Sequence, residues 1–402
     1  MWNFIKDTLT SFFNDVELSI VHGWPWKKSF RQTGATQPLA TDVARILVVQ
    51  LADIGDLVMT SAFLREVRRQ FPKAKVTLIV APLTAPLARS CPDVDEIQVF
   101  DYRSLAGTDW LKKSLGCRAW WKAARRLANR EKESRPDLAF SVRQDADSVQ
   151  LASHIVMASS GARWKIGYEL DPVLLGTRSS QLLDIVVPRA FEGHEVARQL
   201  HLLEEAGWDV SPTASLEYWS TRETESHVEE LHQTLNFSPG QQYIGIHTGS
   251  GHSLKRWPLP FFAEIASWLE KEQNYHLLFF GDESDRADAA HVIDKAGLQR
   301  GTILAGKIPL SVTATYMRRL DGFIGNDSGP FHLAVAAGIP TVGIYGPADP
   351  VRYGPWKGRS KIVTRSLPCS PCSLCCTLDS NRCLTDLPVS LVQQAIREHF
   401  AL

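Results

Sequence analysis

The residues best suited to chemistry begin in the stretch 322–347, where Asn326, Asp327, Ser328 and Gly329 separate an apolar run from a helical pattern. Pro330 suits the first position of that helix. Unpaired amides and the positive end of the helix dipole meet at such a point, so the turn could bind an anion such as a phosphate. The same residue types are common helix caps, and an ordinary capped βαβ turn is an equally good interpretation.

A second glycine-rich loop, 247–257, also follows a predicted strand and precedes a predicted helix. Thr248, Gly249 and Ser250 could form a backbone cradle for phosphate. Lys255 and Arg256 would add charge for a diphosphate, although adjacent basic residues are common on surfaces. The loop matches neither the Walker A sequence nor the dinucleotide fingerprint.

Two acids follow the next predicted strand. Asp282 or Glu283 could bind ribose hydroxyls, since an acid at this point serves that role in nucleotide-binding units. Asp282 could equally be a helix N-cap. Taken together, three strand ends offer a glycine loop with a cation, an acid and a helix N-terminus, which suits a nucleotide diphosphate.

In the first half, Asp53 and Asp56 precede a helix expected over 57–70. The helix dipole favours acids there whatever the function, so structural capping is the default interpretation. The functional alternative is a general base, because the dipole keeps the carboxylate ionised.

Five of the seven cysteines lie between 369 and 383. The spacing of Cys369, Cys372, Cys375 and Cys383 could hold a structural zinc or iron ion in tetrahedral thiolate ligation. Free or paired thiols are the alternative, because the usual two C-x-x-C pairs are absent. No secretory signal is evident, which predicts a cytoplasmic chain in a reducing compartment.

These residues are positioned by a repeating strand–helix pattern that predicts an α/β fold. Strands are expected at 44–51, 76–80 and 138–142, and the rhythm restarts with a strand at 243–247. Two such halves indicate two Rossmann-like domains facing a cleft. The expected divisions are an amphipathic extension 1–40, a first domain 41–212, a linker 213–242, a second domain 243–388 and a final helix 389–402.

Global charge is uninformative, because Lys plus Arg and Asp plus Glu number 44 each. We expect no nucleic-acid partner. The extension 1–40 and a basic, tryptophan-containing segment, 112–135, could contact an anionic membrane surface. For 1–40 the alternative is a helix that packs on the body of the protein or on a partner, and for 112–135 it is a solvated helix face. Both alternatives are favoured over membrane contact.

Four segments carry a resemblance to known proteins: 46–60, 246–258, 304–307, and 325–334 together with 345–347. In this order and spacing the chain resembles the bacterial lipopolysaccharide heptosyltransferases of glycosyltransferase family 9, which have the two-domain GT-B fold. The resemblance implies transfer of a sugar, heptose from ADP-heptose, to a lipid-linked or lipopolysaccharide-core acceptor. It also implies inversion at the sugar, no required metal, and a site on the cytoplasmic face of the inner membrane.

The resemblance also implies roles. Asp56 would be the base, Lys255 would hold the donor phosphates, Glu283 or Asp282 would bind ribose, and Asp327 with its neighbours would lie at the phosphate and sugar. The expected donor site is Thr248, Gly249, Ser250, Lys255, Arg256, Asp282, Glu283, Asp327, Ser328, Gly329 and His332. The expected acceptor site is Asp53, Arg143, Arg163, Lys165 and His194.

One departure falls near the donor: Ile308 and Pro309 replace the threonine or serine usual after Gly-Lys in the family. A nucleotide-sugar epimerase of the same fold is one alternative to a transferase. A non-catalytic protein that binds a sugar nucleotide or a membrane is another.

Overall fold

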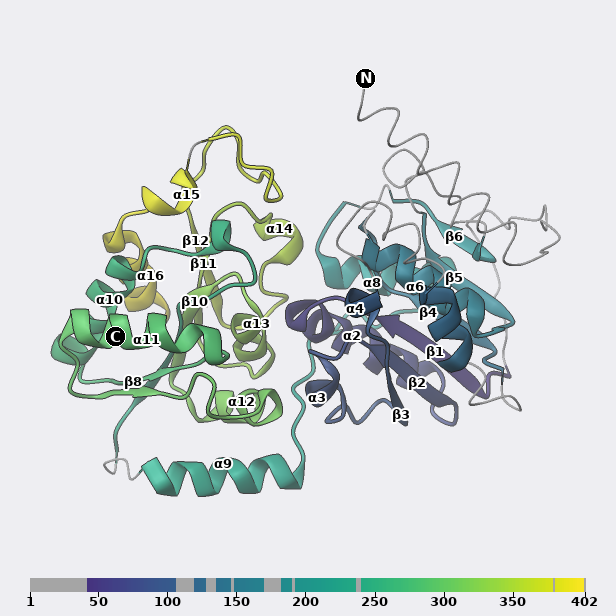
Figure 1. Ribbon diagram of the computed structural model, residues 1–402, viewed down its shortest axis with the longest axis horizontal. Coiled ribbons are helices and arrows are strands. Elements are labelled where there is room, and N and C mark those ends of the chain that lie inside the picture. The colour runs from purple at the N-terminus through teal and green to yellow at the C-terminus, as the bar shows by residue number, and fades with distance from the viewer. Residues whose placement is uncertain are drawn as a thin grey trace. The chain divides into compact units, whose positions relative to one another are not determined.

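A computed structural model describes residues 42–105, 119–127, 135–145, 148–169, 182–189, 192–235, 240–378 and 380–400. The chain divides by its contacts into two compact units, Met1–Ala214 and Ser215–Leu402. Both are α/β units with one parallel sheet each (Figure 1). The predicted extension 1–40 lies outside the described residues.

The first unit is built on a six-stranded sheet with the order β3-β2-β1-β4-β5-β6, and every pairing is parallel. The strands are β1 (Arg45–Gln50), β2 (Lys75–Val80), β3 (Glu96–Val99), β4 (Leu138–Ser141), β5 (Trp164–Tyr168) and β6 (Ile185–Val187). Its central strands are almost entirely buried and mostly apolar, as expected for a sheet covered on both faces.

Helices cover the two faces of this sheet separately. Side chains alternate along a strand, and β4 shows which helix each face meets. Phe140 packs edge-to-face on Phe63 of α2 (Ile54–Gln70), which in turn contacts α8 (Glu195–Glu205). Ala139 faces the other way, into a core shared with α6 (Ser148–Ser159). This unit also has two short helices, α3 (Ala85–Ala88) and α4 (Tyr102–Leu105).

The second unit repeats the design, with a parallel sheet of order β12-β11-β10-β7-β8-β9. Read from its other edge, this order is that of the first sheet. The strands are β7 (Tyr243–His247), β8 (His276–Phe279), β9 (Gly301–Ile303), β10 (Gly322–Asn326), β11 (Thr341–Tyr345) and β12 (Ser360–Thr364).

Alternation along β10 again separates the two faces of the sheet. Ile324 points into a core with α10 (Leu259–Gln273), α11 (Arg286–Ala296) and α16 (Val389–His399). Phe323 packs on Phe280, which contacts Tyr316 of α12 (Leu310–Tyr316). The elements α13 (Gly329–Ala336) and α9 (Arg222–Leu235) both contact α12. Shorter helical turns are η3 (Ser253–Lys255), η4 (Glu283–Asp285), η5 (Met317–Arg319), α14 (Pro350–Tyr353) and α15 (Arg382–Thr385).

The predicted strands and helices are largely confirmed, and β7 and β11 have the predicted bounds. The expected start of the first helix at Leu57 is wrong, because α2 begins at Ile54. Asp53 takes the extended backbone conformation of an N-cap, so the helix starts directly after it. The segment predicted to be a linker, 213–242, contains α9.

The tryptophans of the basic segment 112–135 are only partly within the described residues. Trp120 and Trp121 lie in a helical stretch, 119–127, and each is 4% exposed in the first unit's core. These two rings therefore do not form an aromatic membrane surface. Among the described helices, none combines the length and the apolarity that a membrane span requires.

Candidate functional site

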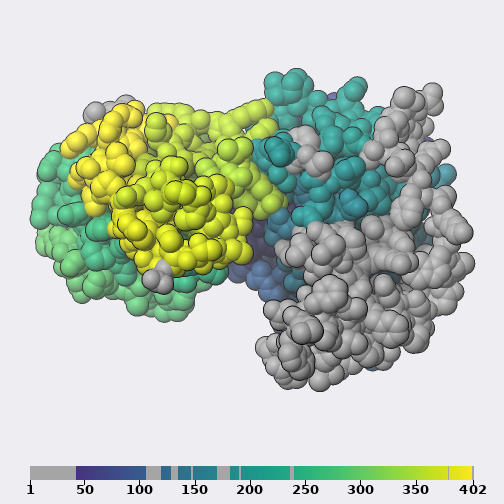
Figure 2. All heavy atoms as spheres, turned by 90° about the horizontal axis from the view of Figure 1, so that it is seen from above, coloured from purple at the N-terminus to yellow at the C-terminus, as the bar shows by residue number. Residues whose placement is uncertain are grey.

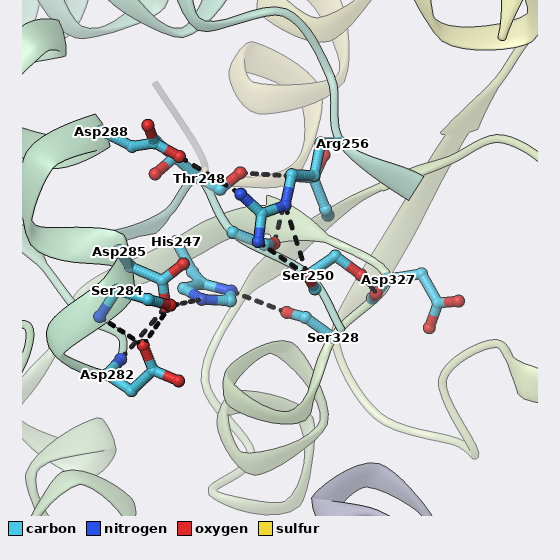
Figure 3. Close-up of polar contacts among 12 residues, drawn as sticks. His247, Thr248, Ser250, Arg256, Asp282, Ser284, Asp285, Asp288, Asp327 and Ser328 are labelled. Carbon is cyan, nitrogen blue, oxygen red and sulfur yellow. Dashed lines mark hydrogen bonds and ion pairs between the residues drawn. The ribbon is translucent and has the colours of Figure 1, made fainter. Parts of the chain in front are cut away.

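In the second unit, the carboxyl ends of three parallel strands bring the predicted donor residues together (Figure 3). The loop after β7 carries residues 248–250, the turn after β8 carries residues 282–285, and β10 leads into Ser328, the residue before α13. Because β7 lies between β8 and β10, all three turns meet at one edge of the sheet. Ligands of open α/β sheets bind at this edge.

Asn326 ties the loop after β7 to the end of β10. Its fully buried side-chain amide donates to the carbonyl oxygens of Thr248 and Gly249, at 2.7 and 3.2 Å. Its side-chain oxygen accepts the backbone N–H of Trp257 at 3.0 Å. Ser250 adds a hydrogen bond from its hydroxyl to the carbonyl of Asp327, at 3.0 Å. Buried amide groups satisfied in this way fix the loop in one conformation.

A buried array of three side chains lies beneath this loop. His247 places Nδ1 2.9 Å from the hydroxyl of Ser328 and Nε2 3.2 Å from Oδ2 of Asp285 (Figure 3). Burial would raise the pKa of Asp285, but the bond and charge of His247 outweigh it and lower that pKa. Our sequence analysis missed His247 and Asp285, since no local pattern pairs a strand-end histidine with a serine 81 residues away.

The array explains the glycine at position 249. A Cβ atom there would lie 2.0 Å from Oδ1 of Asp285 and 2.9 Å from Nε2 of His247. Gly281 is constrained likewise, with a φ of +147° and Asp285 Oδ2 2.4 Å from a built Cβ. Gly251, two residues along the same loop, meets nothing within 4 Å. The requirement for glycine is thus specific to the positions that enclose Asp285.

Lys255 and Asp327 form the most closely held charge pair of the predicted donor site. Lys255 Nζ lies 2.6 Å from Asp327 Oδ2, and the two side chains are 25% and 6% exposed. His332 approaches the other carboxylate oxygen at 3.5 Å. Burial would raise the pKa of Asp327, but His332 and Lys255 together lower it. The carboxylate is therefore ionised at neutral pH, directly before α13.

Asp282 and Glu283 have different surroundings. Asp282 Oδ1 accepts the backbone N–H of Ser284 at 2.7 Å, so the capping interpretation of Asp282 is confirmed. Glu283 is exposed and lies against Gly306, where a Cβ atom would be 2.1 Å from its Oε2. Gly306 has a φ of +70°, a conformation that glycine adopts without strain. The carboxylate of Asp282 is used as a helix cap, whereas that of Glu283 is not.

Arg256 also stabilises the loop after β7. Its guanidinium donates to the carbonyl of Ser250 at 3.1 and 3.3 Å, and it lies 3.4 Å from Asp288 (Figure 3). The side-chain amide of Asn381 donates to the carbonyls of Leu254 and Arg256, at 3.2 and 3.4 Å. Arg256 therefore holds the loop's shape, and the C-terminal segment buttresses the turn that carries Lys255.

The cysteines of this C-terminal segment do not form a metal centre in the part of the chain that the structure describes. No group of three or more His, Cys, Asp or Glu side chains there could hold a metal ion. Cys383 is buried, and both burial and the charges of neighbouring thiols raise its pKa. Figure 2 shows the segment, in yellow, spread over the surface of the second unit. The zinc or iron ion expected from the spacing is not supported.

In the first unit, Asp56 lies in the first turn of α2, at the carboxyl end of the sheet. One carboxylate oxygen accepts the backbone N–H of Asp53 at 3.3 Å, and the other lies 2.9 Å from Nη1 of Arg143. Arg143 also reaches Asp145, at 2.9 Å. Asp56 thus takes part in capping, as the structural interpretation expected, and is held by a cation as well. The more exposed Asp53 pairs with Arg103 at 2.6 Å.

The other expected acceptor residues belong to different elements from Asp56. His194 is the N-cap of α8, and its Nδ1 accepts the N–H of Val196 at 3.1 Å. Arg163 precedes β5, and Lys165 is near the amino end of that strand and bonds to Asp184. Since Asp56 lies at the carboxyl ends of the parallel strands, Arg163 and Lys165 are at the opposite edge of the sheet. An acceptor role for them stays a prediction.

The two parallel sheets have equivalent strand orders, and in each unit the candidate polar residues follow the carboxyl ends of the strands. This is the architecture of a GT-B glycosyltransferase. The sequence model of glycosyltransferase family 9 (heptosyltransferase) matches residues 146–379. The chain belongs to glycosyltransferase family 9.

Relatives of known name agree with this assignment. A lipooligosaccharide heptosyltransferase 2 of Campylobacter jejuni is 31% identical over 163 residues, 39% of this chain and 50% of the relative. The aligned part thus spans about half the length of that protein. The lipopolysaccharide heptosyltransferase 1 of Pseudomonas aeruginosa is 25% identical over 329 residues, 82% of this chain and 86% of the relative.

Solved structures confirm the fold. A family 9 glycosyltransferase from Veillonella parvula superposes with a TM-score of 0.76 at 21% identity, covering 91% of this chain and 99% of the other. The ADP-heptose lipopolysaccharide heptosyltransferase II of Escherichia coli gives a TM-score of 0.67 at 19% identity, covering 89% and 98%. The expected two-domain GT-B architecture is confirmed.

Proposed function

We propose that this chain is an inverting heptosyltransferase that moves heptose from ADP-heptose onto a lipopolysaccharide-core acceptor. The observation that carries the proposal is the Lys255–Asp327 pair, held at 2.6 Å beside the glycine loop and directly before α13. Family membership supports the reaction type, and the names of the Campylobacter and Pseudomonas relatives support the sugar.

The donor diphosphate would bind between the loop after β7 and the first turn of α13. Lys255 would exchange part of its contact with Asp327 for a phosphate oxygen, while the backbone N–H groups of Gly329 and Phe331, in the first turn of α13, face the anion. Asp327 could then accept hydrogen bonds from the sugar hydroxyls. Glu283, above Gly306, would accept hydrogen bonds from the ribose.

The transfer would be a single displacement. The acceptor hydroxyl oxygen attacks the anomeric carbon and passes its proton to Asp56, and the bond from that carbon to the phosphate oxygen breaks. The electron pair of the broken bond leaves with ADP, whose charge Lys255 and the helix N-terminus stabilise. Arg143 would hold the Asp56 carboxylate in place and keep it ionised before the attack.

The proposed steps use only side chains and backbone groups of this chain, and the resemblance to family 9 implies no required metal. The resemblance would place the reaction at the cytoplasmic face of the inner membrane, with a lipid-linked acceptor. A contact between residues 1–40 and anionic lipid would bring the enzyme to this acceptor.

Thermal unfolding with ADP-heptose and with matched UDP- and GDP-sugars tests the donor assignment. A ligand that binds only the folded state at about 100 times its Kd adds about 2.7 kcal/mol to the stability. We expect the transition to rise with ADP-heptose alone. A selective rise with a UDP- or GDP-sugar would change the donor, and no rise with any of them would refute a sugar-nucleotide site.

A further inference from the structure

The hydroxyl of Ser328 does not do what its position in the chain suggests. Ser328 is the N-cap of α13, yet its side chain makes no capping hydrogen bond to the helix. It is instead 2.9 Å from Nδ1 of His247, whose Nε2 faces Asp285 at 3.2 Å. All three side chains are almost fully buried. A cap residue turned away from its helix and toward a buried imidazole calls for a reason.

The protonation of the array follows from its charges. The pKa of Asp285 is low despite burial, because the hydrogen bond and charge of His247 favour the carboxylate. An ionised carboxylate can only accept, so Nε2 of His247 carries a proton. When the imidazole is neutral, Nδ1 is therefore an acceptor and receives the hydroxyl hydrogen of Ser328.

This state is poorly matched to an anion beside α13. The Ser328 hydroxyl then points its lone pairs outward and has no hydrogen left to donate to a phosphate oxygen. When His247 gains a second proton, Nδ1 becomes a donor to Ser328, and the hydroxyl hydrogen is released toward the ligand. The imidazolium also adds one positive charge beneath the phosphate site.

Other charged groups surround the array on the elements packed against it. From η3 and the residue after it come Lys255 and Arg256, and Asp288 on α11 pairs with Arg256 at 3.4 Å. From the turn before α13 and from α13 itself come Asp327 and His332, which approach each other to 3.5 Å. Of these groups, only His332 is a second imidazole.

We propose that His247 is a positioning residue whose proton is coupled to the donor: diphosphate binding draws a proton onto Nδ1, which turns the Ser328 hydroxyl toward a phosphate oxygen. The inference rests on the proposed donor site. The ring orientation also separates this array from a serine hydrolase triad, in which Nε2 faces the serine and Nδ1 the carboxylate. In this chain the two nitrogens are reversed, so the array orients a hydroxyl rather than activating it.

The test is calorimetric titration of the full chain with ADP-heptose, whose diphosphate diester has no ionisation near neutral pH. Titrations at one pH in buffers of different ionisation enthalpy count the protons taken up on binding. The variants are His247→Asn, which keeps a polar group beside Ser328 but cannot gain a proton, and Asp285→Asn. The matched control is His276→Asn, because His276 also bonds a hydroxyl, that of Thr302 at 2.8 Å, but at the amino end of β8.

We expect proton uptake in the wild type and in His276→Asn, and its loss in His247→Asn. The wild-type affinity should fall with rising pH, by up to about tenfold per unit, while that of His247→Asn stays flat. Uptake that survives in His247→Asn assigns the proton elsewhere and overturns the inference. Binding to the wild type without uptake overturns it as well, whereas no binding at all refutes the proposed donor site.

If His247→Asn fails to fold, Asp285→Asn decides the matter. Loss of its carboxylate removes the group that fixes the proton on Nε2, so uptake should decrease and the pH profile should flatten. A pH profile of binding unchanged from wild type in Asp285→Asn would contradict the coupling.

Discussion

The two candidate sites have opposite designs. In the second unit, His247, Asp285 and Asp327 have side chains less than 10% exposed, and each contacts at least two other groups. In the first unit, Asp56 and Arg143 are 18% and 17% exposed and form a short chain of ion pairs with Asp145. The site in the second unit is a buried network of side chains that hold one another in place. The site in the first unit is a partly exposed carboxylate in the first turn of α2.

This difference fits two chemical tasks. A diphosphate is recognised by many weak donors whose directions must be fixed in advance, because preorganised dipoles cost nothing to reorient during the reaction. A general base needs one ionised oxygen that the acceptor can reach. We therefore expect changes in the second unit to act through binding and stability, and changes at Asp56 to act through the rate of transfer.

The largest effect should come from Asp56→Asn. Loss of a general base costs about 10²–10⁴ in rate, and the amide keeps the shape of the carboxylate, so kcat should fall while ADP-heptose affinity stays near wild type. Glu96→Gln is the control, since Glu96 is an ion-paired acid of the same unit, 2.6 Å from Lys75 at the start of β3 and outside both candidate sites. Equal losses in the two variants, or a parallel loss of donor binding, would indicate a structural role for Asp56.

The second largest effect should come from Gly249→Ala. This change should lower stability and donor affinity, whereas Asp56→Asn should lower kcat. The added Cβ would lie 2.0 Å from Asp285, so the loop or the buried array must move, at a cost of about 1–3 kcal/mol in stability. Because the same displacement would misplace the loop's donors, we also expect donor affinity to fall about 10–100-fold, which corresponds to about 1.4–2.7 kcal/mol of binding free energy. Gly251→Ala enters open space and should leave both properties unchanged. Similar results for the two glycines would show that the loop tolerates displacement.

Asp327→Asn separates electrostatics from packing. Since the folded-state pKa of Asp327 is lowered, its carboxylate stabilises the fold above its unfolded pKa of about 3.9, and this contribution is lost as pH falls through the folded value. The variant should be about 1–3 kcal/mol less stable at pH 7, and the gap should close on acidification. Urea unfolding at pH 7 and below pH 4 measures both. A gap that stays constant with pH would mean that the lost contact is steric.

Asn381→Ala should have the smallest effect. It removes the two hydrogen bonds to the carbonyls of Leu254 and Arg256, each worth about 1 kcal/mol or less. We expect the KM for the donor to rise a few-fold with kcat unchanged, in steady-state kinetics. An unchanged KM would show that the C-terminal segment does not support the turn of Lys255.

The sequence was sufficient for the repeating fold and for the donor loops, because each signal is local. Strand runs, the glycine loop and the turn at Asn326 all lie within a dozen residues of the helix they precede. Asp56 and Lys255 were chosen from the same local signals, and the resemblance added their roles as base and phosphate ligand, which stay predictions. Thus the elements and their order along the chain could be predicted without coordinates.

What the sequence concealed was pairing over distance. The sequence around His247 does not indicate that its side chain contacts Ser328 and Asp285. Nor does it indicate that Asn326 bonds to the carbonyls of Thr248 and Gly249. Conversely, clusters of one residue type along the chain gave wrong expectations about sites. The cysteines cluster along the chain without forming a metal site among the described residues, and Trp120 and Trp121 lie beside basic residues yet are buried.

The central claim is tested most directly by incubating the purified chain with ADP-heptose and a heptose-free lipopolysaccharide core, and following both ADP and the glycan product. We predict ADP release that requires the acceptor, a product one heptose heavier with inverted anomeric configuration by NMR, and neither with Asp56→Asn. Conversion of the sugar nucleotide without acceptor would instead indicate an epimerase or a hydrolase. Donor binding without any turnover would contradict the transferase account.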